Sequence, residues 1–359
     1  MIRRSKSESA ALRLEPHESF DDLRNEWTEL ALRAGNVFST WEWLSTWWRH
    51  FGQGHELLLT ACRSPGDRLV AILPLYRRRT GGVRMIRFVG HGPGDHLGPI
   101  SAPAERGEAA HALRCLLREE NRDWDLFLGE QLPTDEGWPA LLNARRISKT
   151  GMPVLCPGGM QWEDFLATRS ANFRQQVRRR ERNLRRRHDV RYRFAGPSNR
   201  LAADLDVLFE LHRRRWQGQR SHFSDDEPFH REFAELAQRH DWLRLWFLEL
   251  DDEPVAAWYG FRYCGVEYFY QAGRDPRREG APGFVLFCHT IRQALEEGVQ
   301  EYRLLRGDEP YKYRFANADR GLDTVGIGRG LLGGAALATG IAARRWRPLR
   351  SMLKGPLDL

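Results

Sequence analysis

The stretch from residue 242 to residue 315 constrains the fold of this chain more than any other part of the sequence. Two runs rich in aromatic and branched residues, LRLWFLEL and PVAAWYGFRY, meet at an acidic turn over residues 251–254, which predicts a β-hairpin. A third predicted strand, VEYFYQAG, leads into the glycine-bearing loop DPRREGAPG, a helical run, FVLFCHTIRQALEEG, and a further strand, YRLLRG. Because the first turn of a helix has unpaired N–H groups and a positive dipole end, the junction of strand, loop and helix is suited to phosphate.

Composition limits the class of protein. The 359 residues predict about two domains of ordinary size, and a hydrophobic content of 41% is ample for packed cores. The net charge of +8, carried mostly by arginine, favours anionic partners. The five cysteines form no CxxC pair, so we expect free thiols in a reducing, cytoplasmic compartment: Cys62, Cys115, Cys156, Cys264 and Cys288. We expect neither a signal peptide nor a membrane span, since no apolar run is long enough.

The order of the predicted elements repeats along the chain. We expect residues 1–11 to be disordered because they are polar. Residues 12–155 are predicted to form two helices, three strands, a loop, a helix and a strand, and residues 156–328 repeat that order. Residues 329–359 are predicted to form a C-terminal helix and tail. The sequence therefore predicts two α/β domains of similar layout, although no repeat of individual residues is visible.

An arginine-rich helix is predicted over residues 162–189, where eight of the fourteen residues from Arg174 to Arg187 are arginine. Its apolar residues share one face, so the helix can dock while the arginines point outward: Phe173, Val177 and Leu184. The face is either merely solvated or an anion surface for CoA phosphates, RNA or anionic lipid. Guanidinium groups bind phosphate bidentately, which favours phosphate contact.

An ordered set of motifs carries a family resemblance. The second half contains LHRRRWQGQRSHF, FHREFAELA, YFYQAGRDP, APGFVLFCHTIRQALEEG and RLLRGDEPYKYRF, and the first half contains FSTWEWLSTWWRHFG, RLVAILPLYRRR and RFVGHGPGDHLGPI. Together, over about residues 36–330, they resemble the GNAT-type acyltransferases of the cellulose-biosynthesis (CelD/BcsL-like) family, which is distantly related to the Fem-type aminoacyltransferases. The resemblance implies an α/β (α+β) fold of tandem duplicated GNAT-like domains, each a mixed, mostly antiparallel sheet flanked by helices.

The resemblance also implies a place for the acyl donor. In a GNAT fold the donor's pyrophosphate sits on backbone amides between the fourth strand and the following helix. Gly280 and Gly283 would let the backbone approach that phosphate closely, and Arg274, Arg277 and Arg278 would add positive charge. The spacing only approximates the GNAT pattern of Arg or Gln, two residues, Gly, one residue and Gly. The alternative is therefore a plain loop that starts a helix.

Acyl transfer needs a base, oxyanion donors and an acid for the leaving thiolate. Asp308 follows a strand and a glycine, where its side chain can project into a cleft, and it is the candidate base or substrate orienter. Tyr311 is the candidate acid near the sulfur. Lys312 and Arg306 are candidates to bind an anionic acceptor or a carbonyl oxygen. The alternative is that Asp308 caps a local turn and Tyr311 belongs to the core.

Three residues near the end of the LHRRRW helix are candidates to line the acceptor pocket. They are Trp216, His222 and Phe223. A purely structural role is the alternative, since an isolated histidine is more often structural than catalytic.

A glycine-rich polar loop in the first half contains the remaining candidate. Asp95 lies there between His91 and His96, where we expect it either to face a groove between the two predicted domains or to shape a turn. Two histidines and one aspartate could suggest a metal, but no further ligands have the required spacing, so we predict no metal site.

The sequence thus predicts a cytoplasmic acyltransferase. It would move an acyl group, most simply acetyl, from acetyl-CoA or another acyl-CoA to an amine or hydroxyl of a small molecule or glycan precursor, as in exopolysaccharide or cell-envelope metabolism. One alternative is a Fem-type transferase that takes an amino acid from aminoacyl-tRNA, and another is a non-catalytic protein that binds nucleic acid or an anionic polymer. The predicted C-terminal helix ends in the basic residues 344–347, which suggests either peripheral contact with the inner face of a membrane or packing on the domain.

Overall fold

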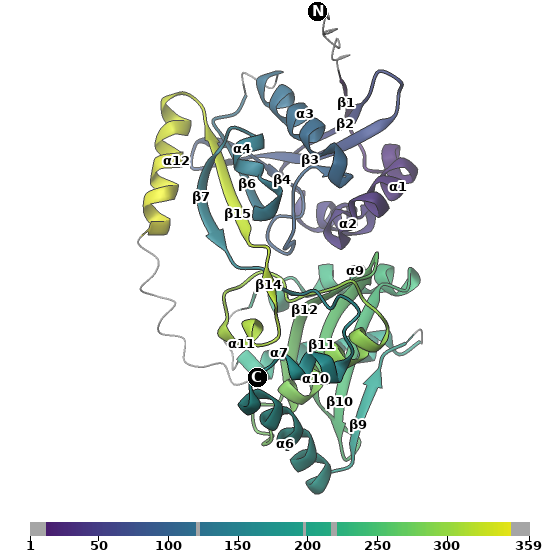
Figure 1. The fold of residues 1–359 in the computed structure, drawn as a ribbon. Coiled ribbons are helices and arrows are strands. Elements are labelled where there is room, and N and C mark those ends of the chain that lie inside the picture. Colours follow the sequence, from purple (N-terminus) through teal and green to yellow (C-terminus); the bar gives the residue numbers. More distant parts are fainter. Residues whose placement is uncertain (1–11, 120–122, 197–198, 217–220, 346–359) are drawn as a thin grey trace, which may run out of the picture. The chain divides into compact units, whose positions relative to one another are not determined.

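Two β-sheets organise the chain (Figure 1). The structure, a computed structural model, describes residues 12–119, 123–196, 199–216 and 221–345. It divides into two compact units: unit 1 holds residues 1–148 and 323–344, and unit 2 holds residues 149–322 and 345–359. The segment predicted to be disordered, residues 1–11, and the tail from residue 346 lie outside the described residues.

Unit 1 is built on a sheet of eight strands within the described residues, in the order β1-β2-β3-β4-β6-β15-β7, with β5 paired to β3. The strands are β1 (Arg13–His17), β2 (Glu56–Arg63), β3 (Leu69–Thr80), β4 (Val83–Phe88), β5 (Ile100–Ser101), β6 (Leu126–Pro133), β7 (Arg145–Thr150) and β15 (Leu322–Gly328). The helices are α1 (Arg24–Ala34), α2 (Trp41–Phe51), α3 (Arg106–Glu119), α4 (Trp138–Leu141) and α12 (Gly330–Arg345). The β4–β6 pair is parallel, and the β1–β2, β2–β3 and β3–β4 pairs are antiparallel.

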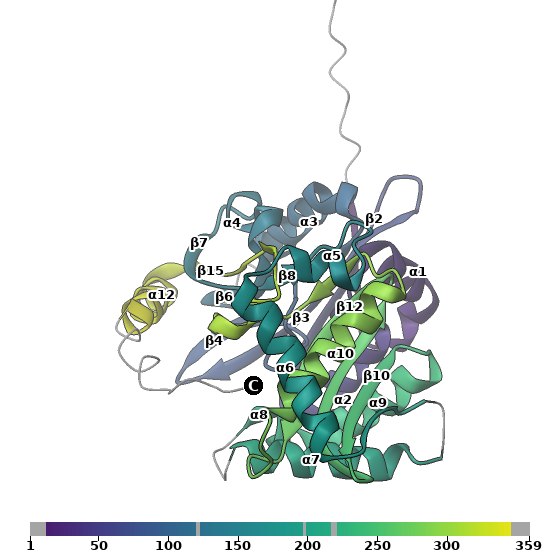
Figure 2. The ribbon, with the colours of Figure 1, turned by 60° about the horizontal axis from the view of Figure 1, so that its bottom comes forward.

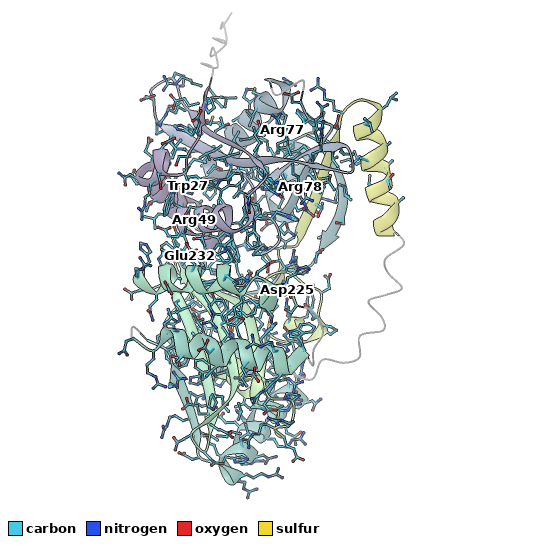
Figure 3. All side chains as sticks on the ribbon, turned by 180° about the vertical axis from the view of Figure 1, so that it is seen from behind. Trp27, Arg49, Arg77, Arg78, Asp225 and Glu232 are labelled. Atoms are coloured by element: carbon cyan, nitrogen blue, oxygen red, sulfur yellow. The ribbon has the colours of Figure 1, made fainter. Side chains whose placement is uncertain are left out.

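Large aromatic side chains fill the core of unit 1. The Thr40 side chain caps α2 by accepting a hydrogen bond from Trp43 N at 3.2 Å, which fixes the start of the helix. Trp43 is buried, and so is Trp27, which donates from Nε1 to the carbonyl of Ser39 at 2.8 Å (Figure 3). The aromatic run of α2 therefore serves packing first.

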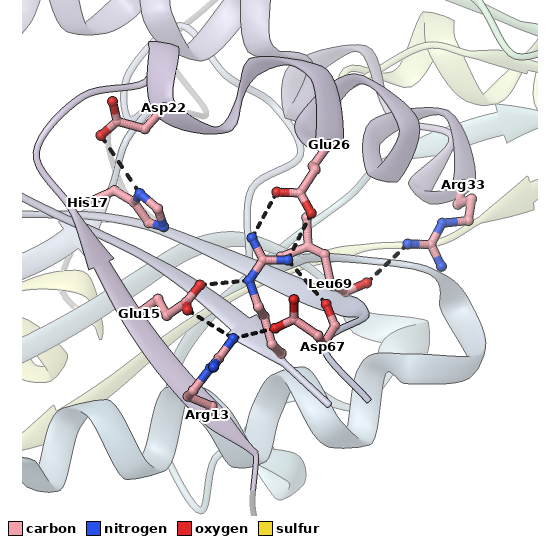
Figure 4. A network of polar contacts seen from close by, with 9 residues as sticks. Arg13, Glu15, His17, Asp22, Glu26, Arg33, Asp67 and Leu69 are labelled. Atoms are coloured by element: carbon pink, nitrogen blue, oxygen red, sulfur yellow. Dashed lines mark hydrogen bonds and ion pairs between the residues drawn. The ribbon is translucent and has the colours of Figure 1, made fainter. Parts of the chain in front are cut away.

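Ion pairs tie the edge strand β1 to its neighbours in unit 1 (Figure 4). Arg63 of β2 donates from Nε to Glu15 at 2.6 Å and from Nη2 to Glu26 of α1 at 2.8 Å. Arg63 lowers the pKa of Glu26 through these hydrogen bonds. A strand at the sheet edge is thereby fixed to both the next strand and the helix above it.

Unit 2 is built on a sheet of seven strands within the described residues, in the order β14-β8-β13-β12-β11-β10-β9. The strands are β8 (Pro153–Leu155), β9 (Val190–Phe194), β10 (Leu243–Leu250), β11 (Glu253–Tyr263), β12 (Val266–Arg274), β13 (Glu301–Arg303) and β14 (Ala318–Asp319). The helices are α5 (Trp162–Ala167), α6 (Ala171–Arg187), α7 (Leu201–Trp216), α8 (His222–Asp225), α9 (Glu227–Arg239), α10 (Pro282–Glu296) and α11 (Pro310–Tyr313). Within the described residues of unit 2, the β12–β13 pair is parallel and the other strand pairs are antiparallel, so both sheets are mixed and mostly antiparallel, as predicted.

Helices cover both faces of the second sheet (Figure 2). Alternate residues of a strand point to opposite faces. Trp258 of β11 therefore packs with α6 and α10, whereas Tyr259 lies near Phe223 of α8 on the other face. The predicted hairpin of β10 and β11 is confirmed, and its turn residues Asp251 and Asp252 have the positive φ values, 55° and 64°, that such turns require.

The division of the chain differs from the predicted boundaries. β8 pairs with β13 and β14 of unit 2, although the prediction placed it in the first domain. β15 lies between β6 and β7 of unit 1, although the prediction placed it in the second. The pairing of these strands is non-local, and periodicity within a strand carries no information about its partner.

Two predicted helices have different bounds. The helix predicted over 162–189 is broken into α5 and α6, because Ser170 leaves the helical conformation and its side chain caps a new helix at Phe173 N, 3.2 Å away. The C-terminal helix α12 ends at Arg345, so Trp346 and the basic residue Arg347 of the predicted helix end lie outside the described residues. None of the described helices is both long and apolar enough to cross a bilayer.

Candidate active site

In unit 2, the neighbouring strands β12 and β13 are paired over only part of the length of β12. The parallel pairing of β12 with β13 covers three residues, from Val266 to Tyr268 opposite Glu301 to Arg303. β12 continues to Arg274 beyond that pairing. Its register with β11 also shifts, so that Tyr270 is an extra, bulged residue between Phe269 and Gln271. In the part of the chain that the structure describes, β12 thus has a strand partner on only one side beyond Tyr268, with a backbone irregularity beside it.

A buried carboxylate shapes the loop that follows β12. Asp275 is buried and accepts hydrogen bonds from Arg277 N at 2.9 Å and from Arg277 Nη2 at 2.7 Å. Arg277 holds the pKa of Asp275 well below its usual range. Arg278 is paired with Glu253. These two predicted donor-binding arginines are therefore engaged with carboxylates of the protein itself.

The first turn of α10 carries the other predicted donor residues. Gly283 is the second residue of the helix, and a Cβ placed there would lie 3.4 Å from Arg274 Cδ, so Arg274 runs alongside the turn. Gly280 has φ +82°, and a Cβ there would meet Leu184 of α6 at 2.6 Å. The structure brings Arg274 and Gly283 together as predicted, and it explains Gly280 by backbone geometry and packing.

Two further arginines gather at this turn, and neither was singled out from the sequence. Arg180 of α6 lies with its guanidinium 4.6 Å from the ring centre of Phe284, and Arg314 lies 5.8 Å from the same ring. Phe284 is the third residue of α10. A signal for Arg180 existed, since it falls at the spacing of the buried face formed by Val177 and Leu184.

The open part of β12 has polar partners from α7. The carbonyl of Ala272 accepts hydrogen bonds from His212 Nδ1 at 3.1 Å and from Arg215 Nη1 at 3.4 Å. His212 is fully buried, and its Nε2 lies 2.8 Å from Ser221 Oγ. Burial lowers the pKa of His212 to about 4, so its imidazole is neutral at physiological pH. Since Nδ1 donates to a carbonyl, Nε2 accepts the proton of the Ser221 hydroxyl.

Sequence reasoning missed these α7 residues. The signal was present, because His212 falls on the apolar stripe of α7, seven residues after Leu205 and four after Leu208. A histidine at a core position of a helix requires a buried hydrogen-bond partner. The identity of that partner, Ala272, could not be read from a position 60 residues away.

Tyr311 lies where it can meet this group. Its ring is 6.4 Å from that of Phe287 of α10. Burial raises the pKa of Tyr311 to about 12, and Arg215 partly offsets that rise. Arg215, which influences the pKa of Tyr311, also donates to the carbonyl of Ala272 on β12. Asp308, by contrast, is exposed and accepts hydrogen bonds from Gly151 N at 2.7 Å and Tyr313 Oη at 3.5 Å.

The other predicted site residues have mixed surroundings. Lys312 is buried, and its Nζ donates to the carbonyl of Arg306 at 2.7 Å and pairs with Glu309 at 3.1 Å, so its ammonium supports the loop. The Arg306 side chain is exposed. The roles predicted for Asp308, Lys312 and Arg306 remain predictions.

The predicted acceptor residues divide between core and surface. Phe223 is buried, with its ring centre 4.9 Å from that of His212. Trp216 is half-buried, with its ring centre 6.1 Å from that of His212, and His222 is exposed. Phe223 and Trp216 thus lie beside the His212–Ser221 pair.

Asp95 lies in unit 1 and is buried. Its neighbour His91 lies with Nε2 3.1 Å from Glu130 Oε2. Among the residues that the structure describes, no group of three or more His, Cys, Asp or Glu side chains is arranged to hold a metal ion.

Comparison with known proteins shows which family and which folds the chain resembles. The model of the family described as acetyltransferase (GNAT) domain matches residues 171–313, from α6 to α11. No curated protein matches the sequence.

Several solved structures share the fold across most of the chain. FemX is 10% identical, with a TM-score of 0.61 over 87% of this chain and 96% of its own. A conserved protein of unknown function from Bacteroides thetaiotaomicron is 12% identical, with a TM-score of 0.57 over 88% of this chain and 100% of its own. L-PGS from Bacillus licheniformis is 13% identical, with a TM-score of 0.54 over 89% of this chain and 95% of its own. Residues 171–313 are therefore similar to the GNAT acetyltransferase family, and the chain shares its fold with FemX.

Proposed function

We propose that the protein transfers an acyl group, most simply acetyl, from acyl-CoA to an amine or hydroxyl acceptor. The observation that carries the proposal is that β12 and β13 separate after Tyr268. The helix α10 begins beside Arg274, and Arg215, which influences the pKa of Tyr311, donates to the carbonyl of Ala272 on β12. An open strand edge, a helix N-terminus and a protonated hydroxyl are the three parts that a long thioester with a diphosphate requires.

The donor would lie along the open edge of β12. Amide groups of the CoA arm would hydrogen-bond to its backbone as an added strand does. The diphosphate would then reach the first turn of α10, where Gly283 leaves room for backbone N–H contact and Arg274 supplies charge. The ring of Phe284 lies at the same turn, with the guanidinium groups of Arg180 and Arg314 beside it.

The catalytic groups would come from two places, the bulge of β12 and the α11 segment. The bulge at Tyr270 leaves a backbone group outside the ladder that could stabilise the oxyanion. Tyr311 would protonate the leaving thiolate, since its raised pKa keeps it protonated at working pH. Asp308 stays the proposed base or orienter of the acceptor. Lys312 and Arg306 would then bind the acceptor only after their mutual hydrogen bond rearranges.

The acceptor side would be formed by Trp216, His222 and Phe223. Aromatic faces of this kind stack on sugar rings, which supports a sugar or cell-envelope precursor, as in the cellulose-biosynthesis family that the sequence resembles. We place the protein in the cytoplasm, where acyl-CoA is available, and allow peripheral contact with the membrane.

Calorimetric titration with acetyl-CoA tests the proposal. Gly283→Asp introduces a carboxylate at the second position of α10, where the helix tolerates it and a Cβ finds room. At about 5 Å from the diphosphate and an effective dielectric constant of roughly 20, the repulsion is about 3 kcal/mol, which weakens binding about 100-fold. Gly107→Asp, at the second position of α3 with nothing within 4 Å, is the matched control and should bind normally. Absence of binding in a folded wild type would refute the proposal.

A second candidate is transfer of an amino acid from aminoacyl-tRNA. The FemX-like fold supports it, and α6 carries three exposed arginines on one face, at i, i+3 and i+7: Arg179, Arg182 and Arg186. Replacing all three with glutamine should lower the slope of log affinity for tRNA against log salt by about 2 to 3. A control with Arg118, Arg200 and Arg239 replaced should keep that slope. Unchanged tRNA binding in the α6 variant would count against this donor.

A further inference from the structure

A cavity of about 460 Å³ opens in unit 2 beside the start of α6. Phe173 forms one wall. The polar side chains that line it come from α6, from the segment before it and from the segment around the end of α11, and include Arg169, Ser170, Asn172, Gln176, Tyr313 and Arg314. No Asp or Glu lines the cavity among the described residues. Its volume exceeds that of a single small ion.

Arg169 is held with part of its guanidinium unused. Its Nη1 donates to the carbonyl of Ala316 at 2.9 Å, and the group lies 4.6 Å from the ring centre of Phe165. Its Nε is buried and has no hydrogen-bond partner among the described residues. Burial lowers the pKa of Arg169, and no carboxylate contributes to offset that effect. An anion in the cavity would meet the part of Arg169 that lines it and would offset the cost of burying the guanidinium charge.

Arg314 brings a second fixed guanidinium to the same cavity. It lies 5.0 Å from the ring centre of Phe173 and donates from Nη2 to Gln176 Oε1. Stacking on an aromatic face and one side-chain hydrogen bond fix the plane of the fork, so less freedom is lost when it meets a ligand. Two positioned guanidinium groups, those of Arg169 and Arg314, thus line one cavity whose described lining contains no carboxylate.

The charge of the cavity indicates the class of ligand. Two guanidinium groups carry two positive charges, and the first turn of the seventeen-residue helix α6 adds its positive dipole end. A phosphate monoester or diphosphate, with a charge of about −2, matches that total better than a single carboxylate does. Its oxygens also fit the bidentate fork of arginine.

We propose that this cavity is a second anion site, which binds the phosphate group of a small molecule through Arg169 and Arg314. The proposal does not depend on acyl transfer, although Arg314 also lies near Phe284 in the first turn of α10. It gives a role to Tyr313 and Arg314, the end of the DEPYKYR block that the sequence assigned to catalysis. Part of that block therefore builds a binding site.

Calorimetric titration with inorganic pyrophosphate, with acetate as a carboxylate control, tests the proposal on the full chain. Asn172→Asp places a carboxylate at the second position of α6, where the helix dipole favours it, so the variant should remain folded. We expect pyrophosphate to bind the wild type, and at least tenfold more weakly to Asn172→Asp and to Arg314→Gln. Arg187→Gln, at an exposed ion pair at the far end of α6, is the matched control and should bind like the wild type.

The two anion sites are separated by their variants. Pyrophosphate should still bind Gly283→Asp, and acetyl-CoA should still bind Asn172→Asp. If pyrophosphate binding is lost in Gly283→Asp and kept in Asn172→Asp, the probe occupies the α10 turn and the proposal is overturned. Equal binding of acetate, or no saturable binding of pyrophosphate to the folded wild type, would overturn it as well. Failure of acetyl-CoA to bind would refute the proposed donor and leave this site standing.

Discussion

Gly273 decides how closely α7 approaches β12, and adding one methyl group there tests that contact. A Cβ at Gly273 would lie 2.6 Å from His212 N, 2.7 Å from Leu211 C and 2.8 Å from Leu211 Cβ. Its backbone conformation suits any residue, so the effect of Gly273→Ala is purely steric. Because two of the three atoms are backbone, α7 must shift as a body to relieve the overlap.

The magnitude follows from the size of the overlap. Carbon contacts are optimal at about 3.5–4.0 Å, so each of the three contacts is too short by about 0.7–0.9 Å. Overpacking of a core costs about 1–3 kcal/mol, and a rigid backbone wall places Gly273→Ala near the top of that range. For a unit of this size, about 3 kcal/mol corresponds to a fall in Tm of about 6–12 °C.

Differential scanning calorimetry provides the measurement, with Gly283→Ala as the matched control. At Gly283 an added Cβ meets only the flexible Arg274 side chain at 3.4 Å, so the substitution should be neutral or stabilise by about 0.5 kcal/mol. The shift of α7 in Gly273→Ala should also move His212 and Arg215 away from Ala272. A Gly273→Ala protein within about 0.5 kcal/mol of the wild type would refute the packing argument.

Three further outcomes are expected. Tyr311→Phe should lower the rate of CoA release from acetyl-CoA, with glucosamine as probe acceptor, by about 100-fold or more, and leave the acetyl-CoA dissociation constant unchanged. Because burial raises the pKa of Tyr311 to about 12, Tyr311 should stay protonated and the wild-type rate should not fall for lack of an acid below about pH 10. In the folded state His212 stays neutral down to about pH 4, whereas an ordinary histidine has a pKa of 6.5. The unfolded state therefore binds more protons between these two pH values, and urea unfolding should show the free energy of unfolding falling as the pH drops from 6.5 to 4. His212→Gln should reduce that slope by about one proton. Val325 is fully buried in β15. Val325→Ala should lower the free energy of unfolding of unit 1 by about 2 kcal/mol, measured by calorimetry, and leave acetyl-CoA binding unchanged. A shift confined to the transition of unit 2 would contradict the assignment of β15 to the first sheet.

Local patterns in the sequence predicted the elements that depend only on neighbours in the chain. The hairpin of β10 and β11 follows from two aromatic runs and an acidic turn, and the helix α10 follows from its apolar spacing. Arg274 and Gly283 are nine residues apart, so predicting the strand–loop–helix unit was enough to place them together.

Longer-range features were decided by tertiary structure alone. The break between α5 and α6 depends on Ser170, a cap that an uninterrupted arginine-rich pattern conceals. The position of β15 in the first sheet, the hydrogen bond from Gly151 N to Asp308 and the presence of Arg169 and Arg314 in one cavity join positions that are far apart in the sequence.

The sequence by itself therefore determined the kinds of elements and their order, and it indicated the turn at α10 as the candidate phosphate site. Backbone conformation and apolar periodicity are local properties, and a single chain displays them directly. The tertiary structure alone decided which polar groups became partners, such as His212 with Ala272 and Tyr311 with Arg215. Such pairs form only after the core has packed, because burial turns each unpaired polar group into a cost that its neighbour must remove.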